Sequence, residues 1–289
     1  MASPLLQNLL TLLEMEQLEE NIFRGESQDL GTGRVFGGQV LGQAISAVQK
    51  SCPERFVHSA HAYFLRAGDC EKPIVYLVNK TRDGRTFSSR TVTAIQNGEP
   101  IFTLLCSLQG EEEGTFDFSL DRDLTPCSFD SPDNGAISVD LENEGIDTFK
   151  YRNDRSKILQ SLPFQITFPS EEADNQSQPE QFWLRTSSEV PKNGGIHQSI
   201  LAFASDFRLL PSTLRAVGYR YRVSEAMLAT ICHAIWFHRP SRVDDWMFHL
   251  SEPLSLSNGR GLARGEIYNS DGQLVASTMQ EGVVRKLRS

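Results

Sequence analysis

The chain has no long hydrophobic run and comparatively little positive charge. No stretch of its 289 residues approaches the roughly 18 consecutive apolar residues that a membrane-spanning helix needs, so we expect no membrane span. Its 28 Lys and Arg residues are outnumbered by 37 Asp and Glu residues, which gives a formal net charge of −9. Because nucleic-acid affinity comes mainly from many cations that neutralise phosphates, we expect no nucleic-acid partner.

The sequence also lacks the spacings of common metal and nucleophile sites. Its five cysteines include no CxxC pair, and their odd number fits a reducing intracellular compartment. No HExxH pattern is present, so we expect neither a metal nor a cofactor. The GxSxG pattern of α/β-hydrolases is absent as well. We interpret the histidines as structural residues: His58, His61, His197, His233 and His238.

The two ends of the chain show no clear targeting signal. Residues 1–20 show leucines at helical spacing but no basic leader followed by an apolar core, which argues against a secretory signal. Leu287, Arg288 and Ser289 do not form the Ser-Lys-Leu peroxisomal signal. We therefore expect a cytoplasmic location and keep a peroxisomal one as the alternative.

Two segments share one order of predicted elements. In the first, two glycines open an apolar-periodic helix, GGQVLGQAISAVQK, which strand-like segments follow as far as residue 109. In the second, a strand-like segment precedes Gly194 and Gly195, and a helix and further strands follow. Three short matches recur in the same order: Tyr63-Phe64-Leu65-Arg66 with Trp236-Phe237-His238-Arg239, Gly84-Arg85 with Gly259-Arg260, and Asn97-Gly98 with Asp271-Gly272.

This duplication predicts an α+β protein of two similar units. Each unit has one long helix and about four or five antiparallel strands, and such a sheet buries its apolar face by curling around the helix. Two such sheets can pair edge to edge, which removes two exposed edges. Acidic, Pro, Gly, Ser and Asn residues dominate the stretch between the repeats. We predict an N-terminal unit at 1–110, an acidic linker at 111–180 and a C-terminal unit at 181–289.

Several motifs resemble one enzyme family. VFGGQVLGQA, HAYFLRAGD, RDGRTFSSRTVTAIQNG, WFHRP and LVASTMQEG together resemble the acyl-CoA thioesterase II (TesB-like) family, from about Leu9 to Arg285. The resemblance implies a double hotdog fold, hydrolysis of fatty acyl-CoA to free acid and CoA, and a homo-oligomer, dimer or tetramer. It also implies that the C-terminal unit carries the active site.

The resemblance assigns catalytic roles to three residues of the second unit: Asp206 in LAFASDF, Thr230 in ATICHAIWFHRP and Gln280 in LVASTMQEG. A carboxylate can accept a proton from an attacking water, while a hydroxyl and an amide orient water, carboxylate or carbonyl. One departure is Cys232, which stands where a TIDH-like segment has Asp. Because side chains two apart on a strand point to one face, we expect Cys232 to flank the site beside Thr230.

The first unit has no carboxylate between Gly37 and Lys50, which predicts one active half per chain. Two alternatives remain open: a non-catalytic acyl-CoA binding protein and a hotdog enoyl-CoA hydratase. The hydratase needs an Asp and a His side by side, yet His197 precedes Asp206 by nine residues, about two and a half helical turns. Four arginines recur at equivalent places, and for them we expect structural roles first and CoA-phosphate contacts second: Arg66, Arg85, Arg239 and Arg260. Lys72 and Arg82 are less symmetric and are equally open as phosphate contacts.

Overall fold

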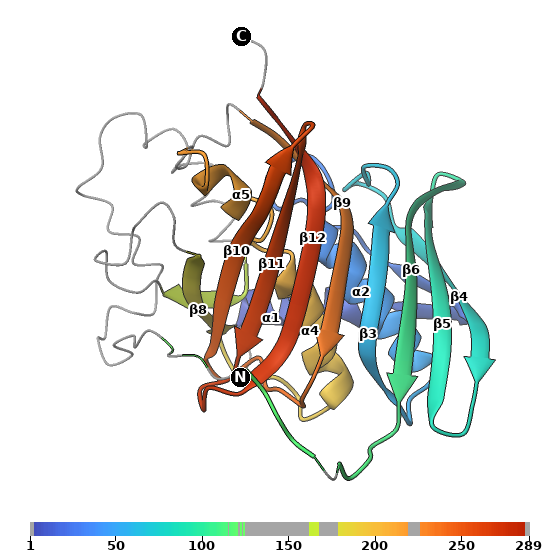
Figure 1. Ribbon diagram of the computed structural model, residues 1–289. Helices are drawn as coiled ribbons and strands as arrows, with labels where there is room; N and C mark the ends of the chain where they lie inside the picture. Colours follow the sequence, from blue (N-terminus) through green and yellow to red (C-terminus); the bar gives the residue numbers. More distant parts are fainter. Residues whose placement is uncertain are drawn as a thin grey trace.

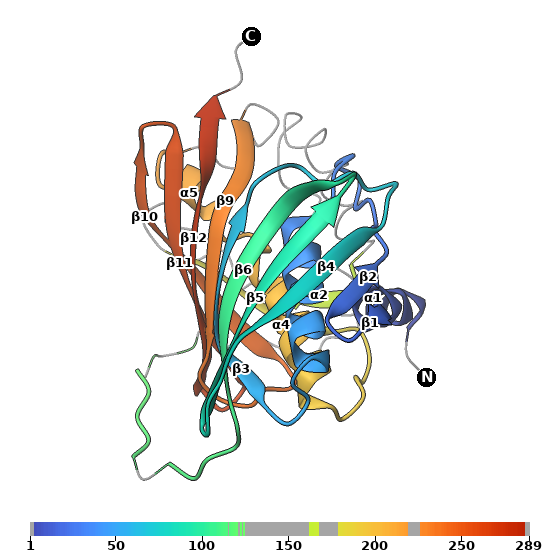
Figure 2. The same cartoon turned by 90° about the vertical axis from the view of Figure 1, so that its right-hand side faces the viewer.

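The computed structural model describes residues 3–114, 116–120, 122, 124, 162–167, 179–218 and 226–286. Across these residues one 12-stranded sheet runs in the order β1-β2-β4-β5-β6-β3-β9-β12-β11-β10-β8-β7, with antiparallel pairing throughout. Figure 1 shows the sheet in front of the helices, and Figure 2 shows it curving around them. The sheet therefore has one outer face and one face that covers the helices.

The first unit supplies one half of this sheet. Its central helix spans the residues predicted from the glycine pair, and a further amphipathic helix at the N-terminal end of the chain buries Leu6, Leu9 and Leu13. Its elements are α1 (Pro4–Glu14), β1 (Glu16–Glu19), β2 (Ile22–Gly25), α2 (Gly37–Lys50), β3 (Phe56–Phe64), β4 (Ile74–Asp83), β5 (Phe87–Gln96) and β6 (Glu99–Gln109).

The second unit repeats this order. Its central helix ends at Ser205 and leaves Asp206 as the C-terminal cap. Its elements are β7 (Phe164–Thr167), β8 (Glu180–Thr186), α4 (Gly194–Ser205), α5 (Ser212–Arg215), β9 (Ala226–Phe237), β10 (Met247–Ser257), β11 (Arg260–Tyr268) and β12 (Leu274–Lys286).

The two units meet along β3 and β9 and along their helices. The strands pair antiparallel, with Ala60 opposite Ile235, so the expected edge-to-edge pairing is confirmed. Helices α2 and α4 pack closely because Gly42 faces the other helix, where an added Cβ would lie 2.8 Å from the Ser199 carbonyl oxygen. Close packing of this kind produces one continuous apolar core across both units.

The duplication extends to individual contacts. Arg66 Nη1 donates to the Pro100 carbonyl at 2.6 Å, and Arg239 Nη1 donates to the Leu274 carbonyl at 2.9 Å. Both pairs tie the end of a central strand to the strand that follows the next hairpin. These two recurring arginines therefore have the structural role expected from their repetition.

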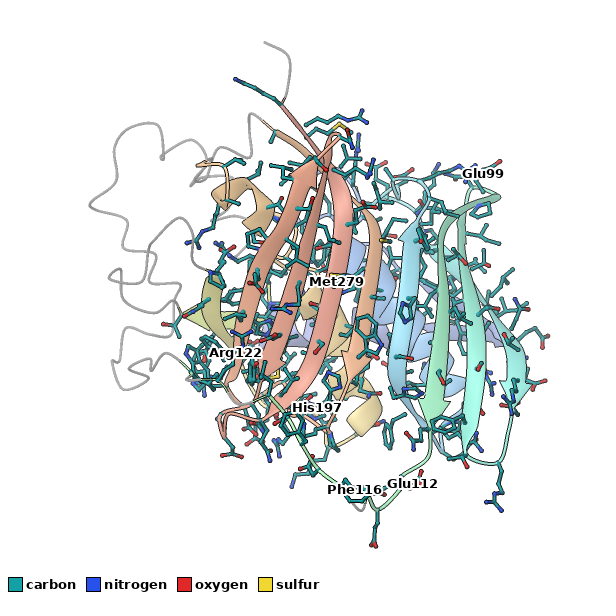
Figure 3. The ribbon with its side chains drawn as sticks, in the orientation of Figure 1. Glu99, Glu112, Phe116, Arg122, His197 and Met279 are labelled. Carbon is teal, nitrogen blue, oxygen red and sulfur yellow. The ribbon has the colours of Figure 1, made fainter. Side chains whose placement is uncertain are left out.

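Most of the expected linker, 111–180, lies outside the described residues. Within it, β7 joins the edge of the sheet by pairing with the following β8, and Arg122 forms an ion pair of 2.7 Å with Glu266 of β11; Figure 3 labels Arg122 beside this part of the sheet. The linker boundaries stay a prediction. No helix of the described chain is long and apolar enough to cross a membrane.

Candidate active site

Asp206 lies at the contact between the two central helices. Its carboxyl follows the last turn of α4 and points at the first turn of α2, where the Gly38 backbone N–H donates to it. The side chain is only 5% exposed. The N-terminal end of a helix presents free N–H groups and a partial positive charge, so the start of α2 favours a carboxylate at this place.

Gln280 joins Asp206 to Thr230. The Gln280 amide nitrogen donates to Asp206 Oδ1 and also to Thr230 Oγ1, the latter at 2.8 Å. Thr230 in turn hydrogen-bonds the Asp206 carboxyl. The structure thus brings together all three residues that the sequence predicted, from α4, β9 and β12.

Strand alternation explains why Gln280 reaches the interior. Burial alternates along β12, with Gln280 buried between the half-buried Met279 and Glu281. Met279 appears on the outer face of the sheet in Figure 3, so its neighbour Gln280 projects toward the helices.

A β-bulge places Thr230 and overturns one expectation. Thr230 pairs with Gly282 but Cys232 pairs with the preceding Glu281, so β9 carries one extra residue, Ile231, at this point. Such a bulge reverses the alternation of faces. Cys232 consequently lies on the outer face, opposite Tyr63 of β3 and Glu281 of β12, and the prediction that it flanks the site beside Thr230 was wrong.

The same bulge brings His233 into the site. It stands opposite Gln280 in the strand pairing and is 1% exposed. Its Nδ1 lies 4.0 Å from Asp206 Oδ1, and its Nε2 lies 3.0 Å from the Ser205 hydroxyl oxygen. The sequence interpretation treated His233 as one more structural histidine. Its place three residues after Thr230 indicates the opposite face of a regular strand, and the bulge is what reverses this.

Burial dominates the electrostatics of the site. It raises the pKa of Asp206 to about 6, against the opposing effect of hydrogen bonds from Gln280, Gly38 and Thr230. Burial also lowers the pKa of His233 to about 4. At neutral pH the site therefore combines a carboxylate of raised basicity with an uncharged imidazole, a combination suited to general-base chemistry.

The equivalent place in the first unit lacks these groups. Gln49 follows Gly37 by the same twelve residues that separate Asp206 from Gly194, and it lies against Gly195 as Asp206 lies against the start of α2. The same bulge recurs, since Val57 pairs with Leu108 and Ser59 with Ser107. The paired positions of Gln280 and His233 are taken by Cys106 and Ala60.

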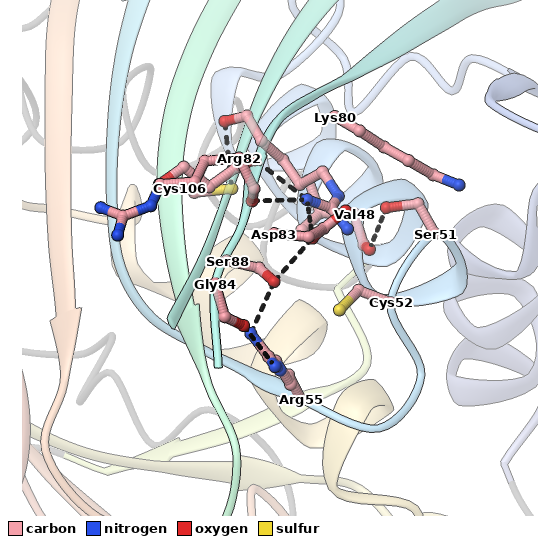
Figure 4. Close-up of polar contacts among 12 residues, drawn as sticks. Val48, Ser51, Cys52, Arg55, Lys80, Arg82, Asp83, Gly84, Ser88 and Cys106 are labelled. Atoms are coloured by element: carbon pink, nitrogen blue, oxygen red, sulfur yellow. Dashed lines mark hydrogen bonds and ion pairs between the residues drawn. The ribbon is translucent and has the colours of Figure 1, made fainter. Parts of the chain in front are cut away.

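The arginines near Cys106 of the first unit already form ion pairs and hydrogen bonds within the chain. Arg90 is buried and forms an ion pair of 2.7 Å with Asp83. Asp83 also accepts from Ser88, which accepts from Arg55, as Figure 4 shows beside Cys106. Arg90 therefore belongs to the internal support of the β4–β5 hairpin and not to an exposed basic cluster.

Other predicted candidates lie elsewhere. His197 is in the first turn of α4, and its Nδ1 accepts from the Val243 backbone at 3.2 Å. The spacing in the sequence predicted that His197 does not pair with Asp206, and the structure agrees. Within the described ranges, no group of three or more His, Cys, Asp or Glu residues could hold a metal ion.

Comparison with known proteins supports one family. Residues 159–283 match the family model "Acyl-CoA thioesterase", and residues 26–109 match "Acyl-CoA thioesterase N-terminal domain". The chain is 38% identical to acyl-CoA thioesterase 2 of Haemophilus influenzae over 292 residues, which cover 98% of this chain and 99% of that protein. The chain belongs to the acyl-CoA thioesterase family.

Further members of the acyl-CoA thioesterase family are similar over the same length. Human acyl-coenzyme A thioesterase 8 is 32% identical over 283 residues, covering 95% of this chain and 88% of that protein. The solved acyl-CoA thioesterase II of Mycobacterium marinum is 31% identical, with a TM-score of 0.76 and coverage of 96% and 98%. A hot dog fold protein of Alicyclobacillus acidocaldarius, 17% identical with a TM-score of 0.72, shares the fold over 97% of this chain and 99% of that one. The expected double hotdog is confirmed.

Proposed function

We propose that this protein hydrolyses fatty acyl-CoA thioesters to free fatty acid and CoA, with a water molecule activated by Asp206. The observation that carries the proposal is the buried Asp206 carboxylate, held by Gln280 and Thr230 in a member of the acyl-CoA thioesterase family. A buried carboxylate is costly unless it is hydrogen-bonded, and here three donors compensate it.

The reaction needs one proton acceptor and one proton donor in sequence. Water attacks the acyl carbonyl carbon while Asp206 takes a proton from it, which yields a tetrahedral intermediate. The carbon–sulfur bond then breaks, and the CoA thiolate takes the proton back from Asp206. A carboxyl with a pKa of about 6 suits both steps, because it is ionised at neutral pH and still accepts a proton readily.

Gln280 and Thr230 act on the carboxylate in this proposal. Since the Gln280 amide nitrogen donates to both Asp206 and Thr230, its hydrogens are committed to fixing their relative positions. Fixed geometry of this kind lowers the entropic barrier to attack. The first unit contributes the start of α2 but no second base, so each chain has one active half.

The test is CoA release from a panel of acyl-CoAs of increasing chain length, measured with a thiol reagent on the purified full chain. Asp206→Asn should lower kcat by about two orders of magnitude or more, the scale of general-base catalysis. Gln49→Asn, at the equivalent helix end of the first unit, is the matched control and should keep wild-type turnover. Turnover that survives in Asp206→Asn contradicts the site assignment.

The same panel separates the two alternative functions when acyl-CoA binding and loss of the enoyl double bond are measured beside thiol release. Binding of acyl-CoA without thiol release in the wild type identifies a binding protein. The closeness of Asp206 and His233 gives the hydratase alternative a specific basis, so 2-enoyl-CoA should be included in the panel. Loss of its double bond without thiol release identifies a hydratase and contradicts the proposed hydrolysis.

We also propose that the protein is a homo-oligomer, a dimer or tetramer. Tyr63 and Leu105 lie on neighbouring central strands of the outer sheet face and are 56% and 52% exposed. Exposed apolar residues at the centre of a sheet are typical of a protein–protein contact. Sedimentation velocity should show an oligomer, and Tyr63→Glu with Leu105→Glu should reduce its size, whereas a wild-type monomer contradicts the proposal.

We retain two further expectations as proposals. The division at 1–110, 111–180 and 181–289 predicts that limited proteolysis cleaves within the middle segment and leaves two fragments associated through β3 and β9. The four described cysteines are free thiols, which supports a reducing compartment and a cytoplasmic location. Cell fractionation tests the latter.

A further inference from the structure

His233 lies beside the proposed base but takes no part in the hydrogen bonds that hold it. The ring is buried, stands opposite Gln280 and presents Nδ1 to Asp206 Oδ1 at 4.0 Å. Within the part of the chain that the structure describes, Nδ1 has no hydrogen-bond partner. A buried polar atom without a partner is costly, so this nitrogen calls for a functional explanation.

The hydrogen bonds of Ser205 fix which ring nitrogen carries the proton. Ser205 Oγ donates to the Ala202 carbonyl at 2.8 Å. A hydroxyl has a single hydrogen, so Ser205 can only accept from His233 Nε2, 3.0 Å away. The neutral ring therefore carries its proton on Nε2, and Nδ1 is a bare acceptor directed at Asp206.

Two acceptors at this separation fit a shared donor. The 4.0 Å between Nδ1 and Oδ1 is too long for a direct hydrogen bond, and two acceptors repel each other. A water oxygen placed about 2.8 Å from both atoms can donate one hydrogen to each. Its two lone pairs then remain free.

We propose that His233 Nδ1 is the second acceptor for the attacking water. Asp206 receives one hydrogen of the water and His233 receives the other, so that a lone pair of the oxygen faces the acyl carbonyl. On attack, the first hydrogen moves to Asp206 as a proton, while the second stays on the oxygen that becomes part of the acid product. This role rests on the proposed thioester hydrolysis.

The first unit is consistent with this role. The position equivalent to His233 is Ala60, and the position equivalent to Asp206 is Gln49. The carboxylate and the imidazole are thus both absent from the half that lacks the base. The first unit has the same bulge without an imidazole. The bulged strand therefore does not need a histidine merely to fill the interior beside it.

Two nearly isosteric substitutions separate the roles of the ring nitrogens. The side-chain amide of His233→Asn reaches the place of Nδ1 and can accept from the water, whereas that of His233→Gln reaches the place of Nε2 and preserves the Ser205 contact. We expect His233→Asn to retain kcat within about tenfold and His233→Gln to lose about a hundredfold, the scale of a misplaced reactant. KM should change little in both. His233→Gln equal to or better than His233→Asn overturns the proposal, because a structural role through Ser205 predicts that order.

A measurement on the wild type does not depend on how the His233 variants fold. In protein labelled with 15N-histidine, the His233 signal is identified as the one displaced by Ser205→Ala. Nδ1 should be unprotonated at neutral pH, and a proton on Nδ1 overturns the proposal. Asp206→Asn serves as the reference in the kinetic series. If it abolishes turnover while His233→Gln does not, this inference alone fails, and if neither changes turnover, the proposed function of the site fails.

Discussion

Gly37 of the first unit and Asp206 of the second lie so close together that no side chain fits between them: a Cβ on Gly37 would lie 2.7 Å from Asp206 Oδ2. The neighbouring Gly38 N–H donates to the same carboxyl. The candidate site is therefore built by both units, although its side-chain groups all come from the second. The glycine pair that opens the first helix has a functional explanation in addition to a helical one.

Gly37→Ala should impair catalysis without unfolding the protein. The added methyl group must displace the Asp206 carboxyl, and a displacement of this size can reduce kcat by about a hundredfold. The matched control is Gly194→Ala, whose Cβ would meet the ring of Phe56 at 2.9 Å. Because Phe56 is 43% exposed, it can move aside, and turnover should stay near that of the wild type. Equal kinetics for both variants and the wild type would show that the approach of α2 to Asp206 has no catalytic consequence.

The pH profile should report the ionisation of Asp206. Because its pKa is raised to about 6, the carboxylate form is complete above this pH and is lost below it. We expect kcat/KM to be level above pH 7 and to fall about tenfold for each unit below about 6. Gln280→Met removes a hydrogen bond that lowers this pKa, so the inflection should move to higher pH while kcat falls.

Gln43→Met is the control for that shift. Gln43 is a buried amide of the first unit that donates to the Leu12 and Glu26 carbonyls and accepts from Tyr76. Its replacement removes comparable hydrogen bonds without touching Asp206. An inflection that moves equally in both variants would mean that general destabilisation, and not the Gln280 contact, sets the profile.

Asp206→Asn should make the fold more stable at neutral pH while it removes activity. A carboxyl whose pKa is raised from 3.8 to about 6 by folding stabilises the protein below the lower value, and this contribution is lost as pH rises through about 6. At pH 7 the ionised group costs about 3 kcal/mol, which the neutral amide avoids. Denaturant unfolding at fixed protein concentration should show the difference at pH 7.5 and a smaller one at pH 5. A variant less stable than the wild type at pH 7.5 contradicts this account.

The sequence predicted most of the fold and the chemical groups of the site, and it failed where the pairing of distant strands sets the geometry. The helix Gly37–Lys50 was predicted residue for residue, because its apolar spacing and opening glycines are local signals. Asp206, Thr230 and Gln280 were identified through the family resemblance, since residue types far apart in a chain carry no geometry. The bulge at Ile231 depends on strand register, which the sequence does not record. For this reason Cys232 was placed on the wrong face, and the closeness of His233 to Asp206 was not foreseen.

The bulge gives a sharp prediction for Cys232. If it lies on the outer face, as its pairing with Glu281 and Tyr63 indicates, then Cys232→Asp places a carboxylate on the side of the sheet away from Asp206. We expect its kcat to match the wild type within about threefold and the inflection of its pH profile to stay in place.

Thr230→Val, two residues earlier but on the inner face, removes a hydroxyl that contacts both Gln280 and Asp206. Its kcat should fall by about tenfold to a hundredfold, the scale of a lost hydrogen bond to a charged group. A regular strand predicts instead that both substitutions perturb the site. A shifted inflection in Cys232→Asp would therefore contradict the bulged register, because a second carboxylate raises the pKa of Asp206 only if the two lie close together.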